Sequence, residues 1–68
     1  MSKQSNAAPL ALDTKGAARL LGVSVSLLEH LRMTPERSPR FFKIGSAIRY
    51  RVSDLEQWAM ARAEGGHQ

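Results

Sequence analysis

The side chains in this sequence that could do chemistry are mainly cations, and they are concentrated in one segment. Residues 32–51 contain six Lys or Arg residues and a single acid, which gives a net charge of +5, whereas the whole chain has +4. Clustered cations attract polyanions, and phosphate groups are prominent among them. We predict that this segment binds a phosphate-rich partner; the alternative is a solvated basic face. The cations are Arg32, Arg37, Arg40, Lys43, Arg49 and Arg51.

Residue sets for catalysis or metal binding are missing. The chain has no Cys, and its only His residues are His30 and His67, whereas a structural zinc site needs four ligands that are usually Cys or His. A phosphate-binding loop, a Ser/His/Asp set and paired carboxylates in an apolar setting are also missing, and 68 residues are too few to enclose a substrate pocket beside a core. We therefore predict a protein that is not an enzyme and has no metal or cofactor.

Two short helices are predicted before the basic segment. The first covers residues 12–22, with Asp13 as its N-cap and Gly22 as the residue that ends it. The second covers residues 23–33, with Ser24 as its N-cap. A connection of about three residues containing Gly makes two helices cross steeply, as in a helix-turn-helix. The apolar residues predicted to face inward are Ala17, Ala18, Leu20, Leu21, Leu27, Leu28 and Leu31.

A β-hairpin is predicted next, after a Pro-containing loop over residues 34–40. Apolar and basic residues alternate on both sides of Gly45-Ser46-Ala47, which is the pattern of two strands joined by a tight turn. The alternation places the cations Lys43, Arg49 and Arg51 outward. The apolar residues predicted to face inward are Phe42, Ile44, Ile48, Tyr50 and Val52.

A third helix is predicted over residues 53–64. Ser53 is its expected N-cap, and Glu56 completes a capping box. Trp58 and Tyr50 are predicted to lie in the core, which argues against single-strand binding because that needs exposed aromatic rings. Residues 1–11 are predicted to be a disordered arm and residues 64–68 a disordered tail, on either side of one domain over residues 12–63. The N-terminal sequence predicts neither a signal peptide nor a membrane span, and hence a cytoplasmic protein.

Four stretches in this order carry a resemblance to a known family: "AARLLGVS", "KIG", "IRYR" and "SDLEQW". The chain resembles, over about residues 12–62, the winged helix-turn-helix proteins of the excisionase and AlpA group, which are related to the DNA-binding domain of MerR regulators. The resemblance implies a mainly α fold with a small β-hairpin, the winged helix-turn-helix. The sequence departs from the family pattern at Gly16, where the family often has Glu, and at Ser46, where an Arg at the tip of the wing is common.

The resemblance also implies where DNA would bind. A recognition helix over residues 24–33 would face the major groove, and a wing around Gly45-Ser46-Ala47 would lie on the flanking backbone or minor groove. The implied residues of the helix are Ser24, Val25, Ser26, Glu29, His30 and Arg32, and those of the loop and wing are Arg37, Arg40, Lys43, Ser46, Arg49 and Arg51.

Several of these residues have alternative roles. Ser24 can cap the helix as well as touch phosphate, and Ser26 and His30 can bond base edges or be solvated. Glu29 can accept from a cytosine amino group, repel phosphate, or pair with Arg32 along the helix, and we favour the pair. Arg51 can bridge to Asp54 instead of binding DNA.

The implied function is sequence-specific binding of double-stranded DNA. One role is an excisionase, or recombination directionality factor, which binds attachment-site DNA cooperatively, bends it and directs an integrase toward excision of a mobile element. Its expected partners are DNA, the integrase and adjacent head-to-tail copies of itself. The alternative role is an AlpA-like transcriptional regulator of phage or integrated-element genes. A different class of function is an interaction module whose basic face docks an acidic protein or structured RNA.

Overall fold

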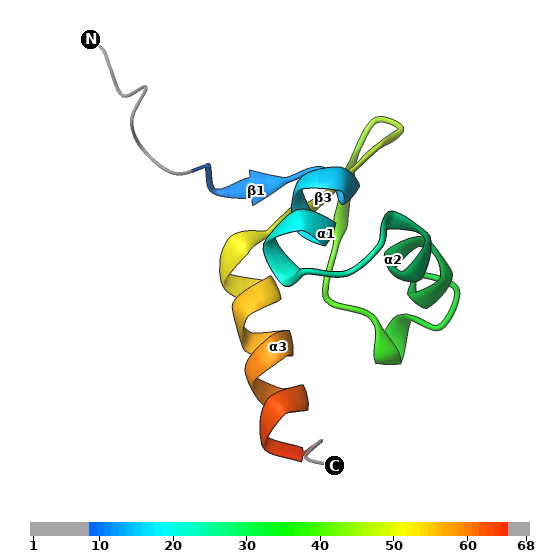
Figure 1. Cartoon of the computed structure of the whole chain (residues 1–68). Helices are drawn as coiled ribbons and strands as arrows, with labels where there is room; N and C mark the ends of the chain where they lie inside the picture. The colour runs from blue at the N-terminus through cyan, green and yellow to red at the C-terminus, as the bar shows by residue number, and fades with distance from the viewer. Residues whose placement is uncertain (1–8, 66–68) are drawn as a thin grey trace, which may run out of the picture.

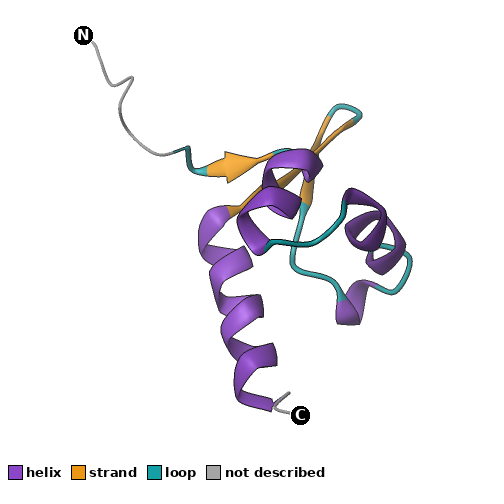
Figure 2. Ribbon diagram, in the orientation of Figure 1, coloured by secondary structure: helices purple, strands orange, loops and turns teal. Residues whose placement is uncertain are grey.

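The computed structural model describes residues 9–65 and shows three α-helices and a three-stranded antiparallel sheet (Figures 1 and 2). This mixed α/β arrangement has more sheet than the predicted two-stranded hairpin. The elements in chain order are β1 (Ala11–Leu12), α1 (Thr14–Leu21), α2 (Val25–Leu31), the 3₁₀ helix η2 (Pro35–Arg37), β2 (Phe42–Ile44), β3 (Ala47–Arg51) and α3 (Val52–Gly65).

The additional strand is β1, whose Ala11 was predicted to lie in a disordered arm and whose Leu12 was predicted to begin the first helix, which instead begins at Thr14. The strand order is β1-β3-β2, and Ala11 pairs with Arg51 while Leu12 pairs with Tyr50. The prediction is therefore wrong for Ala11, because a two-residue strand has no periodicity that a sequence pattern could reveal. Residues 1–8 of the predicted arm lie outside the described residues. The predicted disordered tail is also wrong for residues 64 and 65, because they belong to α3. Residues 66–68 of this tail lie outside the described residues.

The ends of the first two helices agree with the prediction. The Asp13 carboxylate accepts a hydrogen bond from the Gly16 N–H at 2.8 Å, and Gly22 adopts the left-handed conformation with φ of 74°. The Ser24 hydroxyl oxygen accepts from the Leu27 N–H at 3.1 Å. Since α1 ends at Leu21 and α2 begins at Val25, the two helices are joined by three residues, as predicted.

Replacing Ser24 by Ala is expected to lower the free energy of unfolding by about 1 kcal/mol, because the Leu27 N–H at the start of α2 loses its acceptor. Chemical denaturation of the purified protein measures this change. Ser26→Ala is the matched control, since Ser26 is exposed as the second residue of the same helix and should change the stability little. Equal losses in the two variants would contradict the assignment of Ser24 as the cap.

The core is small and is built from all three helices and the sheet. Ala17, Ala18, Leu28, Tyr50 and Leu55 are its buried apolar residues. The small side chains of α1 let this helix lie close to its neighbours.

The predicted inward stripes are too wide, because Leu20 is 52% exposed and Leu27 is 40% exposed. Ala17, Ala18 and Leu21 form the inner face of α1, and Leu20 lies beyond its edge. In α2 a helix of seven residues presents Leu28 to the core and leaves Leu27 at the border.

The start of α3 differs from the predicted capping box. The helix begins at Val52, directly after β3, and the Val52 N–H donates to the Leu10 carbonyl oxygen at 2.9 Å. The first turn of α3 is therefore attached to the chain before β1. The Ser53 hydroxyl instead accepts from Arg51 Nη2 at 3.4 Å, so the prediction of Ser53 as a cap with Glu56 is wrong.

Candidate nucleic-acid interface

The outer face of α2 presents polar residues to solvent. Ser26, Glu29 and His30 are all exposed, as the sequence predicts for a face that contacts a partner. Ser24 is also exposed, although its hydroxyl is already used as the N-cap. Val25 was predicted to face outward and does not, since it is half-buried and packs against the core cluster.

Arg32 does not lie on this outer face, which corrects its predicted role. Its Nη1 donates to the Tyr50 hydroxyl oxygen at 2.7 Å and to the Thr14 Oγ1 at 3.1 Å, and its guanidinium lies 5.9 Å from the centre of the Phe41 ring. Arg32 is the C-cap residue of α2, so its side chain leaves the end of that helix toward α1 and β3. It joins three elements of the fold, and it makes no ion pair with Glu29 within the described residues.

The hairpin has a two-residue turn, and this reverses the predicted inward and outward faces of the side chains of β2. Gly45, with φ of 62°, and Ser46 connect Ile44 directly to its partner Ala47. The predicted turn of three residues would have paired Ile44 with Ile48. A shift of one residue moves every side chain of a strand to the other face of the sheet.

Two apolar residues consequently lie on the basic side of the hairpin. Phe42 pairs with Arg49, and cross-strand partners share one face. Phe42 is 38% exposed and Ile44 is 64% exposed, so the prediction that they face inward is wrong. Lys43 pairs with Ile48 and lies on the opposite face, where it remains exposed two residues before the turn.

The remaining cations of the basic segment differ in their exposure to solvent and in their contacts within the protein. Arg37, Arg40 and Lys43 are exposed. Arg49 is half-buried, and its Nη1 donates to the Ile48 carbonyl oxygen at 2.7 Å. Arg51 forms the predicted alternative contact, an ion pair with Asp54 at 3.6 Å, although its side chain is still 55% exposed. An exposed pair of this kind contributes little to stability, so Arg51 can exchange Asp54 for a phosphate at small cost.

Trp58 holds the loop that carries Arg37. Its indole Nε1 donates to the Arg37 carbonyl oxygen at 3.1 Å, and the Arg62 guanidinium lies 4.6 Å from the centre of its ring. Trp58 is half-buried, so the prediction that it belongs to the core holds in part. The contact fixes the position of η2 relative to α3.

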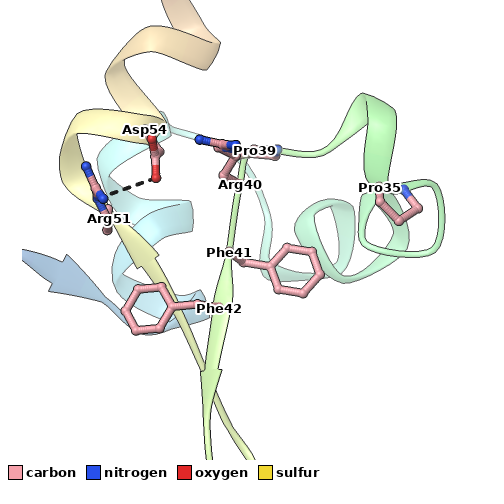
Figure 3. Close-up of a pocket in the computed structure, with 7 residues that line it drawn as sticks. All are labelled: Pro35, Pro39, Arg40, Phe41, Phe42, Arg51 and Asp54. Atoms are coloured by element: carbon pink, nitrogen blue, oxygen red, sulfur yellow. Dashed lines mark ion pairs between the residues drawn. The ribbon is translucent and has the colours of Figure 1, made fainter.

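In space, α2 and the tip of the hairpin lie on the side of the molecule away from the C-terminal half of α3 (Figure 1). Ser46 is exposed in the turn at this tip. In the view of Figure 1, α2 and the hairpin both lie to the right of α3, with the hairpin tip projecting above α2. The predicted site residues of α2 and of the hairpin therefore lie in these two elements, whereas Arg37 lies in η2 and Arg40 and Arg51 lie near the start of α3 (Figure 3).

An open pocket near the start of β2 was not predicted from the sequence. Its volume is about 660 Å³. Figure 3 shows Phe41 and Phe42 pointing to opposite sides of the strand, with the Arg51–Asp54 pair on the side of Phe42. The signal that could have revealed it is the pair of Phe residues, since adjacent residues of a strand cannot both face the core. The lining residues are Pro35, Pro39, Arg40, Phe41, Phe42, Arg51 and Asp54.

Among residues 9–65 there is no group of three or more His, Cys, Asp or Glu residues placed to hold a metal ion. None of the helices in this part of the chain is long and apolar enough to cross a membrane. No known family model matches the chain, and neither does any curated protein. Its function is therefore inferred from the residues and their geometry.

Proposed function

We propose that the chain is a winged helix-turn-helix protein that binds double-stranded DNA without catalysing a reaction. In this proposal α2 lies in the major groove and the β2–β3 hairpin is the wing on the flanking backbone or minor groove. The observation that carries the proposal is the combination of an exposed polar face on α2 with exposed cations in the basic segment, in a fold where α2 and the hairpin lie on the same side of α3 (Figure 1). A major groove is wide enough to admit an α-helix.

The contacts proposed for DNA follow from this placement. Ser26, Glu29 and His30 face base edges, and the α2 N-terminus near Ser24 faces a phosphate, since helix N-termini attract anions. The phosphate contacts of the loop and wing come from exposed or half-exposed cations, with Ser46 at the tip. These cations are Arg37, Arg40, Lys43, Arg49 and Arg51.

The biological role that we favour is an excisionase that binds attachment-site DNA and directs an integrase of a mobile element, acting in the bacterial cytoplasm. A small module of this kind gains affinity by binding adjacent sites with head-to-tail copies. The test is DNase footprinting on the attachment region and on the promoters of the same element. Phased protection of several direct repeats beside the attachment core supports the excisionase, whereas protection confined to a promoter supports a transcriptional regulator. Protection of neither DNA contradicts both roles.

Replacing Arg49 by Ala is expected to weaken binding to every duplex and to flatten the log–log dependence of affinity on salt by about 0.9, because one phosphate contact is lost. Titrations of a labelled duplex at several salt concentrations measure the slope. Arg62→Ala is the matched control, since Arg62 lies on α3 and contacts Trp58. An unchanged slope in Arg49→Ala removes this residue from the set that contacts phosphate.

A further inference from the structure

The free edge of strand β2 is the feature that the proposed function leaves unexplained. In the strand order β1-β3-β2, one edge of β2 has no partner among the described residues, and all three of its residues are exposed. An edge strand presents N–H and C=O groups that another chain can pair with. Such an edge is a binding surface for an extended peptide.

The register identifies the backbone groups that face this edge. A two-residue turn closes on Ile44 and Ala47, whose N–H and C=O groups are directed at one another. Residues along an antiparallel ladder alternate between facing the partner and facing away. The N–H and C=O of Lys43 therefore point away from β3 and toward the free edge.

The side chains around this edge have a specific pattern. In sequence the cation Lys43 lies between Phe42 and Ile44, whose exposed apolar side chains share the face of Arg49, whereas the Lys43 side chain lies on the opposite face. A strand that pairs with β2 would place an acidic side chain beside Lys43 and apolar side chains beside Phe42 and Ile44. The open pocket of about 660 Å³ adjoins the start of β2, and Phe41 and Arg40 are among its lining residues.

We propose that the free edge of β2 and the adjoining pocket bind an extended protein segment in which acidic and apolar residues alternate. Charge complementarity favours this occupant over a second copy, because like charges directly opposite one another in a sheet are unfavourable and β2 paired with itself would bring two Lys43 side chains together. The edge also favours a protein segment over duplex DNA, because a phosphate can accept from the outward N–H but has no donor for the outward C=O and no apolar group for Phe42 and Ile44. The proposal goes beyond DNA binding and does not depend on it.

The test uses the full chain and a fluorescent synthetic peptide in which Glu and Val alternate, with one terminal Phe for the pocket. Fluorescence anisotropy is expected to show saturable binding, and amide shifts of the isotope-labelled protein are expected to change along residues 40–44. The same peptide methylated on alternate backbone nitrogens is expected to bind at least about tenfold more weakly, because it cannot pair with the edge. A peptide with Lys in place of Glu should not bind measurably.

Two variants of Lys43 separate the contribution of its backbone N–H to peptide affinity from the contribution of its side-chain charge. Lys43→Pro removes the outward N–H as well as the charge, and Lys43→Gln removes the charge alone. We expect a larger loss of peptide affinity in Lys43→Pro than in Lys43→Gln. The methylated peptide tests the same pairing without any variant, so a misfolded Lys43→Pro protein does not prevent a decision.

Four results would overturn the proposal: no binding of the acidic peptide, equal binding of the methylated peptide, equal binding of the basic peptide, or amide shifts confined to α2. Competition of the peptide with dimer formation, seen by sedimentation, would assign the edge to a second copy instead. DNase footprints are measured separately, so failure here leaves the DNA-binding proposal unaffected.

Discussion

Replacing Arg32 by Met is expected to lower the free energy of unfolding by about 2 kcal/mol, because a buried hydroxyl left without a partner costs about 1–3 kcal/mol. The hydroxyl belongs to Tyr50, which is fully buried and accepts from Arg32 Nη1 at 2.7 Å. Thr14 loses its contact with Arg32 in the same variant. In a domain of this size the loss corresponds to a fall of roughly 8–16 °C in the melting temperature. Denaturant titration and thermal melting followed by circular dichroism measure both quantities.

A double-mutant cycle distinguishes this explanation from a general loss of packing. Tyr50→Phe removes the hydroxyl that Arg32→Met would leave unpaired, so the double variant should be less destabilised than the sum of the two single variants. The DNA measurement gives a second criterion. If Arg32 positions α2 and does not touch phosphate, Arg32→Met, measured at a temperature at which the variant is folded, should leave the salt dependence of DNA affinity unchanged. A slope flattened by about 0.9 would return Arg32 to the phosphate-contacting set.

Replacing Leu28 by Ala is expected to have an even larger effect on folding, a loss of about 3 kcal/mol in the free energy of unfolding. Leu28 is fully buried and is the residue of α2 at the centre of the core. Its truncation leaves a cavity between elements that a small chain cannot easily collapse. A domain of this size has only a few kcal/mol of stability, so a large unfolded fraction is expected in the absence of a ligand. Denaturant titration in buffer without DNA measures the loss.

Leu27→Ala is the matched control, since it makes the same chemical change one position earlier in the same helix. Leu27 is 40% exposed, and its truncation should cost well under half as much as that of Leu28. Comparable losses in the two variants would show that the inner face of α2 is wider than the structure indicates.

Local signals in the sequence were sufficient for the order and ends of most elements. Asp13, Gly22 and Ser24 mark helix ends because each satisfies or permits a backbone conformation within three residues of itself. The alternating pattern around Gly45 likewise predicted a hairpin. The exposed placement of Ser26, Glu29 and His30 was also predictable, because it follows from helical periodicity alone.

Features that depend on residues distant in sequence could not be predicted in this way. Arg32 is of a residue type that commonly contacts DNA. Only the position of Tyr50 across the fold shows that the Arg32 guanidinium donates a hydrogen bond within the protein. The faces of Phe42 and Ile44 depended on whether the turn has two residues or three, and the sequence allows both. The start of α3 was misplaced because the Leu10 carbonyl, not a side chain, accepts from its first N–H.

Strand β1 has a consequence for how the chain becomes folded during its synthesis. The α1–α2 pair and the β2–β3 hairpin each join neighbouring segments, but Ala11 pairs with Arg51. Closing so long a loop costs entropy that only later contacts recover. On the ribosome, β1 emerges well before its partner strand and stays unpaired until β3 has left the exit tunnel. The sheet is therefore completed only after β3 has emerged, in a step that ties the start of the described domain to the first turn of α3.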